Sequence, residues 1–136
     1  DGHEPLEPFD FGQVLGIADA LPMLVAYIGP DQRYRFVNKA LAGFFERPRR
    51  EIIGATVREM IGEEGYAVRR PMLEAALAGE RQWFAAEFEH PSRGTVALQT
   101  EYIPQRPAED GPVQGVVILV QDVTERHEAM LSLQAS

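Results

Sequence analysis

The sequence contains no cysteine and only three histidines among its 136 residues. The absence of cysteine excludes disulfide bonds, thiolate catalysis and zinc sites built on cysteine. The histidines, His3, His90 and His127, are far apart along the chain and indicate no metal cluster. His127 and the glutamate after it match the first half of the zinc motif H-E-x-x-H, but Leu131 stands where the second histidine is needed. We therefore expect no metal site.

Basic residues are in the minority, with 13 Lys and Arg against 21 Asp and Glu and a net charge of −8 at pH 7. Phosphate binding needs clustered Lys and Arg, so this balance predicts no nucleic-acid partner. Long apolar runs are missing too, because no stretch approaches the roughly 20 apolar residues that span a bilayer. We expect no membrane contact by this segment and a cytoplasmic location, whether or not a longer parent protein is membrane-anchored.

Catalytic motifs are also missing. The chain has no glycine-rich phosphate loop, no G-x-S-x-G elbow and no pair of carboxylates at a catalytic spacing. What is present is an ordinary globular balance of 45% hydrophobic and 25% charged residues, over a length sufficient for one domain. We expect a single domain without enzymatic activity.

The clearest local signal is the segment 113–126. It begins with a run rich in Val, Ile and Leu that follows a turn containing Gly111 and Pro112, and this pattern predicts a β-strand. Asp122 can then cap a helix, and Glu125, three residues later, can complete a capping box. A buried strand is thus predicted to continue directly into a polar helix.

The remaining elements follow from hydrophobic periodicity and from the positions of Gly and Pro. Residues 1–9 hold two prolines among acidic residues, and we expect a disordered leader. Asn38 can cap a short helix or contact a ligand, and we favour the cap. Thr56 and Glu59 fit a capping box, whereas Pro71 predicts a kink or a later start in the longest helix. The predicted elements are a flanking helix over 10–21, strands over 23–28 and 34–38, helices over 39–45, 49–53, 56–61 and 63–78, strands over 82–90, 95–103 and 113–121, and a helix over 123–136.

This order places two strands first, then the helices, then three strands. A five-stranded antiparallel sheet with helices on one face is an α+β fold, in the chain order β-β-α-α-α-β-β-β, with flanking helices at both ends. We place the domain at 22–122. The alternative is a small α+β barrel enzyme of the ketosteroid-isomerase type, which places its helices before a long run of strands and so fits this order poorly.

A sheet covered by helices on one face leaves a hollow between the two layers, and that hollow is the default ligand site. Apolar residues at the right period either line it or simply pack in the core. Arg70 differs, because an arginine on the apolar line of a helix reaches solvent or pairs with a carboxylate ligand. The candidates for this site are Phe36, Met60, Tyr66, Arg70, Leu73, Phe84, Phe88, Leu98 and Tyr102.

Three motifs, in this order along the chain, resemble those of the PAS family. They are R-Y-R-F-V-N over 33–38, followed by K-A-L-A-G-F-F, then R-P-R-R-E-I-I-G-A-T-V-R-E-M-I-G over 47–62 and D-V-T-E-R over 122–126. In PAS domains the last motif joins the final strand to a signalling helix. The resemblance implies a sensory-box module for signal transduction and dimerisation, as in the sensor histidine kinases of two-component systems or in diguanylate cyclases.

The resemblance also implies a homodimer, an output domain in the same parent chain and a salt bridge between Asp122 and Arg126. Haem-binding relatives use a histidine on the long helix, which 63–78 lacks, and light-sensing relatives use a flavin-reactive cysteine, which the chain lacks. We therefore expect neither cofactor, while an unidentified small molecule fits the hollow. A ligandless protein–protein interaction scaffold is the competing hypothesis. The expected signal-transfer residues are Asp122, Thr124, Glu125 and Arg126.

The last predicted strand supports a dimer independently, because it is apolar on both of its faces. One face can pack against the helices of the domain. The other needs a cover from the N-terminal helix or from a second subunit.

Overall fold

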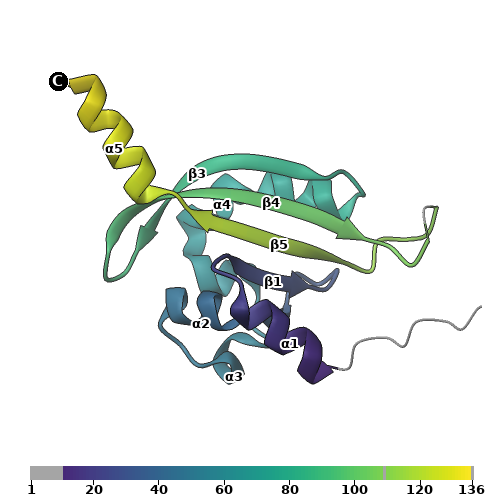
Figure 1. Ribbon diagram of the computed structural model, residues 1–136. Helices are drawn as coiled ribbons and strands as arrows, with labels where there is room; N and C mark the ends of the chain where they lie inside the picture. The colour runs from purple at the N-terminus through teal and green to yellow at the C-terminus, as the bar shows by residue number, and fades with distance from the viewer. Residues whose placement is uncertain (1–10, 109, 136) are drawn as a thin grey trace, which may run out of the picture.

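The computed structural model describes residues 11–108 and 110–135 (Figure 1). The expected disordered leader, residues 1–9, lies outside the described residues. Five antiparallel strands form one sheet in the order β2-β1-β5-β4-β3, which confirms the predicted α+β fold. The strands are β1 (Leu24–Ile28), β2 (Tyr34–Val37), β3 (Gln82–His90), β4 (Gly94–Gln105) and β5 (Gly115–Asp122).

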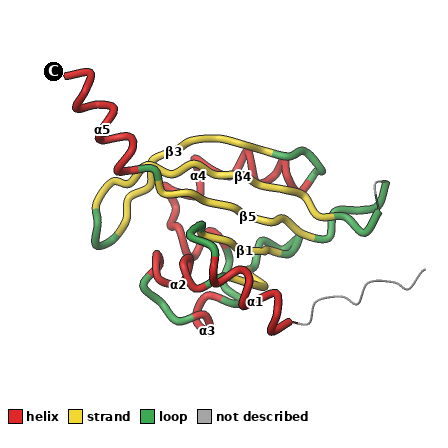
Figure 2. Tube along the Cα trace, viewed as in Figure 1, coloured by secondary structure: helices red, strands yellow, loops and turns green. Residues whose placement is uncertain are grey.

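Three helices lie between β2 and β3 in the sequence and pack on one face of the sheet (Figures 1 and 2). A fourth helix precedes the domain, and a fifth extends away from the sheet beyond β5 (Figure 1). None of the described helices is both long and apolar enough to cross a lipid bilayer. The helices are α1 (Phe11–Ala20), α2 (Lys39–Phe45), α3 (Arg49–Ile52), α4 (Val57–Leu77) and α5 (Thr124–Ala135).

The core forms where the alternating side chains of the sheet meet the helices. In β4 the residues Val96, Leu98, Thr100 and Tyr102 are buried, while the residues between them are half-buried on the other face. Successive side chains of a strand point to opposite faces, so this pattern places one face of β4 against the helical layer. The helices contribute fully or almost fully buried residues to the same core, namely Leu41, Ile52, Val57, Leu73 and Ala76.

Helix α4 consists of two segments. The predicted capping box is confirmed, because Thr56 Oγ1 accepts from the backbone N–H of Glu59 at 3.1 Å and Glu59 Oε1 accepts from the backbone N–H of Thr56 at 3.2 Å. The helical dihedral angles are interrupted at Gly62, which has a positive φ of 80° that glycine adopts at little cost. The helix continues through Pro71, so the alternative of a later start at this proline is wrong.

Asn38 fixes the junction of α1, β1 and α2, and its predicted role as a helix cap is confirmed. Its side-chain oxygen accepts from the backbone N–H groups of Leu41 and Val25, each at 3.0 Å. Its amide nitrogen donates to the carbonyls of Ala18 at 2.8 Å and Met23 at 2.9 Å. All four contacts are internal, and Asn38 is completely buried.

The sheet face opposite the helices is partly uncovered. Val117 and Leu119 of β5 lie there, opposite Tyr27 and Val25 of β1, and are half-buried. Further along the same face Trp83 is 73% exposed. Helix α1 is attached to the beginning of α2, where Asp19 accepts from the backbone N–H of Lys39 at 2.7 Å. Within the described residues, α1 therefore leaves the surface around Trp83 open.

We predict that Asn38→Ala lowers the free energy of unfolding by about 3–5 kcal/mol, because the cap is lost and several buried backbone groups lose their partners. Urea denaturation followed by circular dichroism measures this difference. The exposed Gln121 provides a control, since Gln121→Ala should change stability by less than about 0.5 kcal/mol. A loss below about 1 kcal/mol for Asn38→Ala would contradict the prediction.

Candidate functional site

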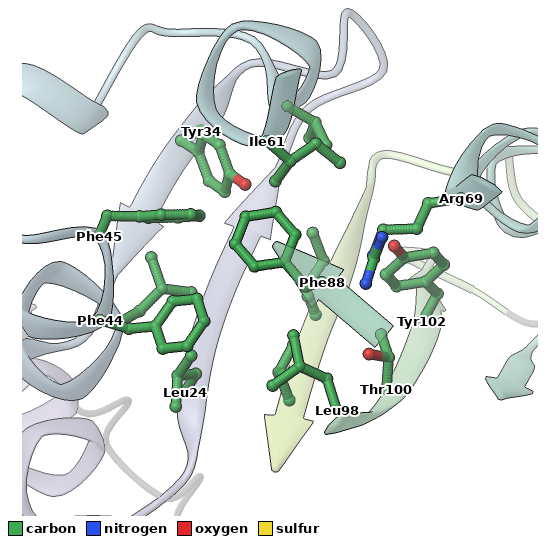
Figure 3. A pocket seen from close by; sticks show the side chains of 14 residues that line it. Leu24, Tyr34, Phe44, Phe45, Ile61, Arg69, Phe88, Leu98, Thr100 and Tyr102 are labelled. Atoms are coloured by element: carbon green, nitrogen blue, oxygen red, sulfur yellow. The ribbon is translucent and has the colours of Figure 1, made fainter. Parts of the chain in front are cut away.

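A cavity of about 50 Å³ lies between the sheet and helices α2 and α4 (Figure 3). Five of its fourteen lining residues are aromatic. The rings of Phe44 and Phe45 meet edge to face at 5.7 Å between centroids, and Phe44 lies 5.9 Å from the ring of Phe88. The lining residues are Leu24, Tyr34, Leu41, Phe44, Phe45, Val57, Ile61, Arg69, Phe88, Leu98, Thr100, Tyr102, Ile118 and Val120.

Arg69 supplies the charge in this lining. It is only 5% exposed, and its guanidinium donates to the carbonyls of Gly65 at 3.2 Å and Glu87 at 3.3 Å. The guanidinium also lies over the ring of Phe88, 5.5 Å from the centroid. No salt bridge links it to a carboxylate among residues 11–108 and 110–135. Burial lowers the pKa of Arg69, since desolvation disfavours the charged form.

Three hydroxyl-bearing residues complete the polar part of the wall. Tyr34 and Tyr102 are almost fully buried, and burial raises the pKa of both phenols, so both are neutral O–H donors at ordinary pH. Thr100 is 2% exposed, and its Oγ1 has no hydrogen-bond partner in the described part of the chain. Figure 3 shows the guanidinium of Arg69 beside the hydroxyl of Tyr102, with Thr100 close by.

The structure brings some of the expected ligand-site residues together and separates others. Phe88, Leu98 and Tyr102 line the cavity. Leu73 is completely buried in the core. Met60, Tyr66 and Phe84 pack against that core outside the cavity lining.

Two of the expected placements are wrong. Phe36 pairs with Tyr27 across β1 and β2, and directly paired residues share a face, so Phe36 lies on the side away from the helices. Arg70 is exposed and binds Glu74 of the same helix at 2.8 Å. Neighbouring residues of a helix point about 100° apart, so the arginine that enters the cavity is Arg69 instead.

Sequence reasoning missed Arg69 although a signal was present. Arg69 precedes the buried Leu73 by four residues, and residues at this spacing share a helix face. The same holds for Thr100, which alternates with Leu98 and Tyr102 along β4. Tyr34, Phe44 and Phe45 reach the cavity from elements whose packing the sequence does not specify.

The junction between β5 and α5 is the second candidate site. Asp122 Oδ1 accepts from the backbone N–H of Thr124 at 3.0 Å and from its hydroxyl at 2.6 Å. The Thr124 hydroxyl oxygen accepts from the backbone N–H of Ala97 at 2.9 Å, and the carbonyl of Ala97 accepts from the backbone N–H of Val123 at 2.9 Å. These bonds attach the first turn of α5 to β4.

The expected partners of Asp122 differ from those observed. Its salt bridge is made with Arg93, at 2.8 Å, and not with Arg126. The carbonyl of Val123 accepts the first helical hydrogen bond, from His127 at 2.8 Å, so Asp122 lies one residue before the cap and the expected capping box with Glu125 is wrong. Glu125 and Arg126 are exposed.

His90 connects the junction with the cavity wall. It is 5% exposed and lies at the end of β3. Its Nε2 lies 2.5 Å from the carbonyl oxygen of Phe44, which requires the proton on Nε2. Its Nδ1 then accepts from the backbone N–H groups of Ser92 and Arg93, each at 3.2 Å. The side chain of the same Arg93 binds Asp122.

Comparison with known families decides the identity of this fold. The family model described as the PAS fold matches residues 18–128. The chain belongs to the PAS family. The resemblance of its three motifs is thereby confirmed, and the chain is a sensory module of the PAS type.

Solved structures share this PAS fold at low sequence identity. The chain is similar to an RNA-binding light-oxygen-voltage receptor, with 20% identity over 98% of this chain and 42% of the receptor and a TM-score of 0.70. It is similar to a sensory box sensor histidine kinase from Vibrio cholerae, with 20% identity over 82% of this chain and 89% of the kinase chain and a TM-score of 0.61. It is also similar to VqmA of Vibrio cholerae in a complex with ligand and DNA, with 17% identity over 95% of this chain and 61% of VqmA and a TM-score of 0.73. The PAS domain thus spans less than two thirds of the receptor and of VqmA, and identities of this size show the fold alone.

We predict that Asp122 stabilises the PAS domain above about pH 4 and that this contribution is lost in acid. Burial raises the pKa of Asp122, but hydrogen bonds from Thr124 and the pairing with Arg93 outweigh burial and hold the pKa below its usual value. A carboxyl with a lowered folded-state pKa contributes stability above its unfolded pKa and loses it as pH falls through the folded value.

Asp122→Asn should therefore cost roughly 1 kcal/mol at pH 7 and nothing near pH 2, after allowance for solvent screening. Thermal unfolding of both proteins between these pH values measures the difference. The variant should keep some acid sensitivity, because Arg49 also holds the pKa of Asp19 low. If the stability of the wild type and that of Asp122→Asn changed in parallel between pH 7 and pH 2, Asp122 would not be responsible for the loss of stability in acid.

Proposed function

We propose that this PAS domain is a sensory and dimerisation module of a signal-transduction protein. In this proposal a change in the cavity reaches α5 through the junction at Asp122–Arg126, and α5 passes it to an output domain of the same parent chain. A sensor histidine kinase or a diguanylate cyclase would be such an output. The similarity to a sensor histidine kinase from Vibrio cholerae supports the first. The role of the domain is conformational and includes no catalytic step.

One observation carries the proposal: a chain of polar contacts runs from the cavity wall to α5. It begins at the carbonyl of Phe44, continues through the ring of His90 to Arg93, and reaches Asp122 and Thr124. Hydrogen bonds are directional, so a displacement of α2, which carries Phe44, changes the position of His90 and of the β3–β4 turn. The contact between Arg93 of this turn and Asp122 then changes as well. The contacts give a physical route, and the substitution of Arg93 tests its last step, from the β3–β4 turn to α5.

Helix α5 is suited to respond, because in the described part of the chain it is exposed beyond its first turn. Residues 125–134 are all exposed. The orientation of the helix therefore depends on its first turn, where Val123 and Thr124 bind Ala97. An element with few buried contacts has a low free energy of local opening, so small changes at the junction shift its population of conformers.

A ligandless scaffold is the second candidate function, and the size of the cavity favours it. The volume of about 50 Å³ is well below the roughly 300–1,000 Å³ of drug-sized ligand pockets. The polar wall favours the sensor, since buried polar groups normally have partners. Within the scaffold hypothesis the junction and the dimer remain, and only the ligand is absent.

Dimerisation is supported by apolar side chains that this single chain leaves exposed. Trp83 projects from the uncovered sheet face with 73% exposure, and Ile17 on α1 is 54% exposed. On α5, Met130 and Leu133 are 56% and 78% exposed. A second copy would cover apolar surface of this kind, which is costly in water.

For the step from the β3–β4 turn to α5, we expect Arg93→Gln to accelerate amide hydrogen exchange in residues 123–128 about tenfold, because Asp122, which binds the first residue of α5, loses its charge-assisted contact. Hydrogen exchange followed by mass spectrometry measures this. Arg126→Gln serves as the matched control and should leave exchange of the same amides unchanged. Equal effects of the two substitutions would contradict a route through Arg93, and no effect of either would contradict the proposed signal transfer.

For the dimer, we expect sedimentation equilibrium to show a dimer and Trp83→Glu to weaken it at least about tenfold, because a charge would be buried in an apolar contact. Val68 provides the control, since it is 53% exposed on α4, in the helical layer on the other side of the sheet. Val68→Glu should leave the dimer intact. A monomeric wild-type protein would overturn this part of the proposal.

A further inference from the structure

The cavity contains donor groups that have no partner among residues 11–108 and 110–135. Arg69 uses two of its five N–H groups, and both contacts are long for charge-assisted hydrogen bonds. Thr100 Oγ1 is buried and has no partner in the described residues. Leaving such buried groups without partners is unfavourable, and more so when the group is charged. Arg69 and Thr100 therefore favour a ligand in the cavity that accepts hydrogen bonds.

The charge of the wall specifies the occupant further. The guanidinium of Arg69 is desolvated, and the other lining residues carry no formal charge. Tyr34 and Tyr102, neutral phenols, add O–H groups to the same cavity. A planar guanidinium binds a carboxylate through two parallel hydrogen bonds, and this pairing strengthens where water is excluded. An anion with a planar oxygen pair satisfies these requirements, whereas a neutral acceptor leaves the charge unbalanced.

The apolar walls and the volume of the cavity limit the polarity and the size of the rest of the ligand. Phe44 and Phe45 offer apolar surface on the side away from Arg69, and the ring of Phe88 lies between them and the guanidinium (Figure 3). A volume of about 50 Å³ corresponds to roughly four water-sized spheres, which allows a carboxylate with about two to four carbon atoms.

We infer that the cavity is a binding site for a short-chain aliphatic carboxylate, whose carboxylate group pairs with Arg69 and whose hydrocarbon part packs against Phe44, Phe45 and Phe88. Thr100 and Tyr102 donate to the carboxylate oxygens. This inference rests on the proposed sensory function, and it supplies the class of ligand that this function requires.

Isothermal titration calorimetry with sodium propionate tests the inference on the whole chain. Propionamide has the same shape without the charge, and sodium chloride at equal ionic strength controls for general anion effects. We expect saturable binding of propionate, with propionamide at least about tenfold weaker and chloride without effect. Equal binding of propionate and propionamide would falsify the carboxylate assignment, and chloride competing at equal concentration would show a site for any small anion.

Two neighbouring arginines provide a matched pair of variants. Arg69→Gln should weaken propionate binding at least about tenfold, whereas Arg70→Gln, which alters an exposed residue paired with Glu74, should bind as the wild type does. Equal affinities of the two variants would overturn the role of Arg69. If Arg69→Gln does not fold, Thr100→Val and Tyr102→Phe decide instead: each should weaken binding about fivefold, and unchanged affinity in both would overturn the site.

The outcomes separate this inference from the proposed function. Failure of propionate to bind, together with a junction that still responds to Arg93→Gln, overturns the carboxylate ligand alone. A junction that does not respond to Arg93→Gln overturns the signalling proposal, whatever the cavity binds. Propionate binding that also slows hydrogen exchange at residues 123–128 supports both.

Discussion

The two-residue alternation of β4 is the constraint on which the rest of the structure depends. β4 lies between β3 and β5 and presents Leu98, Thr100 and Tyr102 to the helical layer. Its intervening positions face the other way, and the backbone of one of them, Ala97, holds the first turn of α5. A shift of register by one residue would remove the hydroxyls from the cavity and turn the strand's apolar side chains toward solvent. Cavity and junction are therefore positioned by the same strand.

The energetic cost of burying the Arg69 guanidinium, and the contacts that offset this cost, determine the polarity of the cavity. Transfer of a guanidinium out of water costs several kcal/mol, and Arg69 recovers part of this cost through two backbone carbonyls and the face of Phe88. Arg70, one residue further, avoids the cost by remaining in solvent with Glu74. The two arginines show that position on a helix, and not residue type, decides whether a charge becomes part of a site. Asp122 is intermediate, because its hydrogen bonds outweigh the effect of its partial burial.

The order of the elements could be predicted because periodicity, Gly, Pro and capping residues are local signals, and Thr56 and Asn38 show these signals acting as caps. The site was predicted less completely because its geometry is non-local. Arg69 and Arg70 are adjacent, so their side chains point about 100° apart on the helix. A single sequence does not show which of these two directions faces the sheet, and Arg70 was therefore predicted in place of Arg69. The partner of Asp122 is Arg93, from a turn that only the β4–β5 pairing brings near. Phe36 was misplaced because β1 and β2 pair with a bulge, after which strict alternation no longer assigns the face.

The interruption of α4 at Gly62 divides the wall of the cavity between two helical segments. Val57 and Ile61 belong to the short segment before the glycine, and Arg69 belongs to the longer one after it. Rotation about the two dihedral angles of Gly62 moves these groups relative to each other without altering the dihedral angles inside either segment. A glycine resists such rotation less than any other residue. The shape of the cavity on its helical side thus depends on the conformation of a single backbone position, whereas the sheet forms the cavity's other wall.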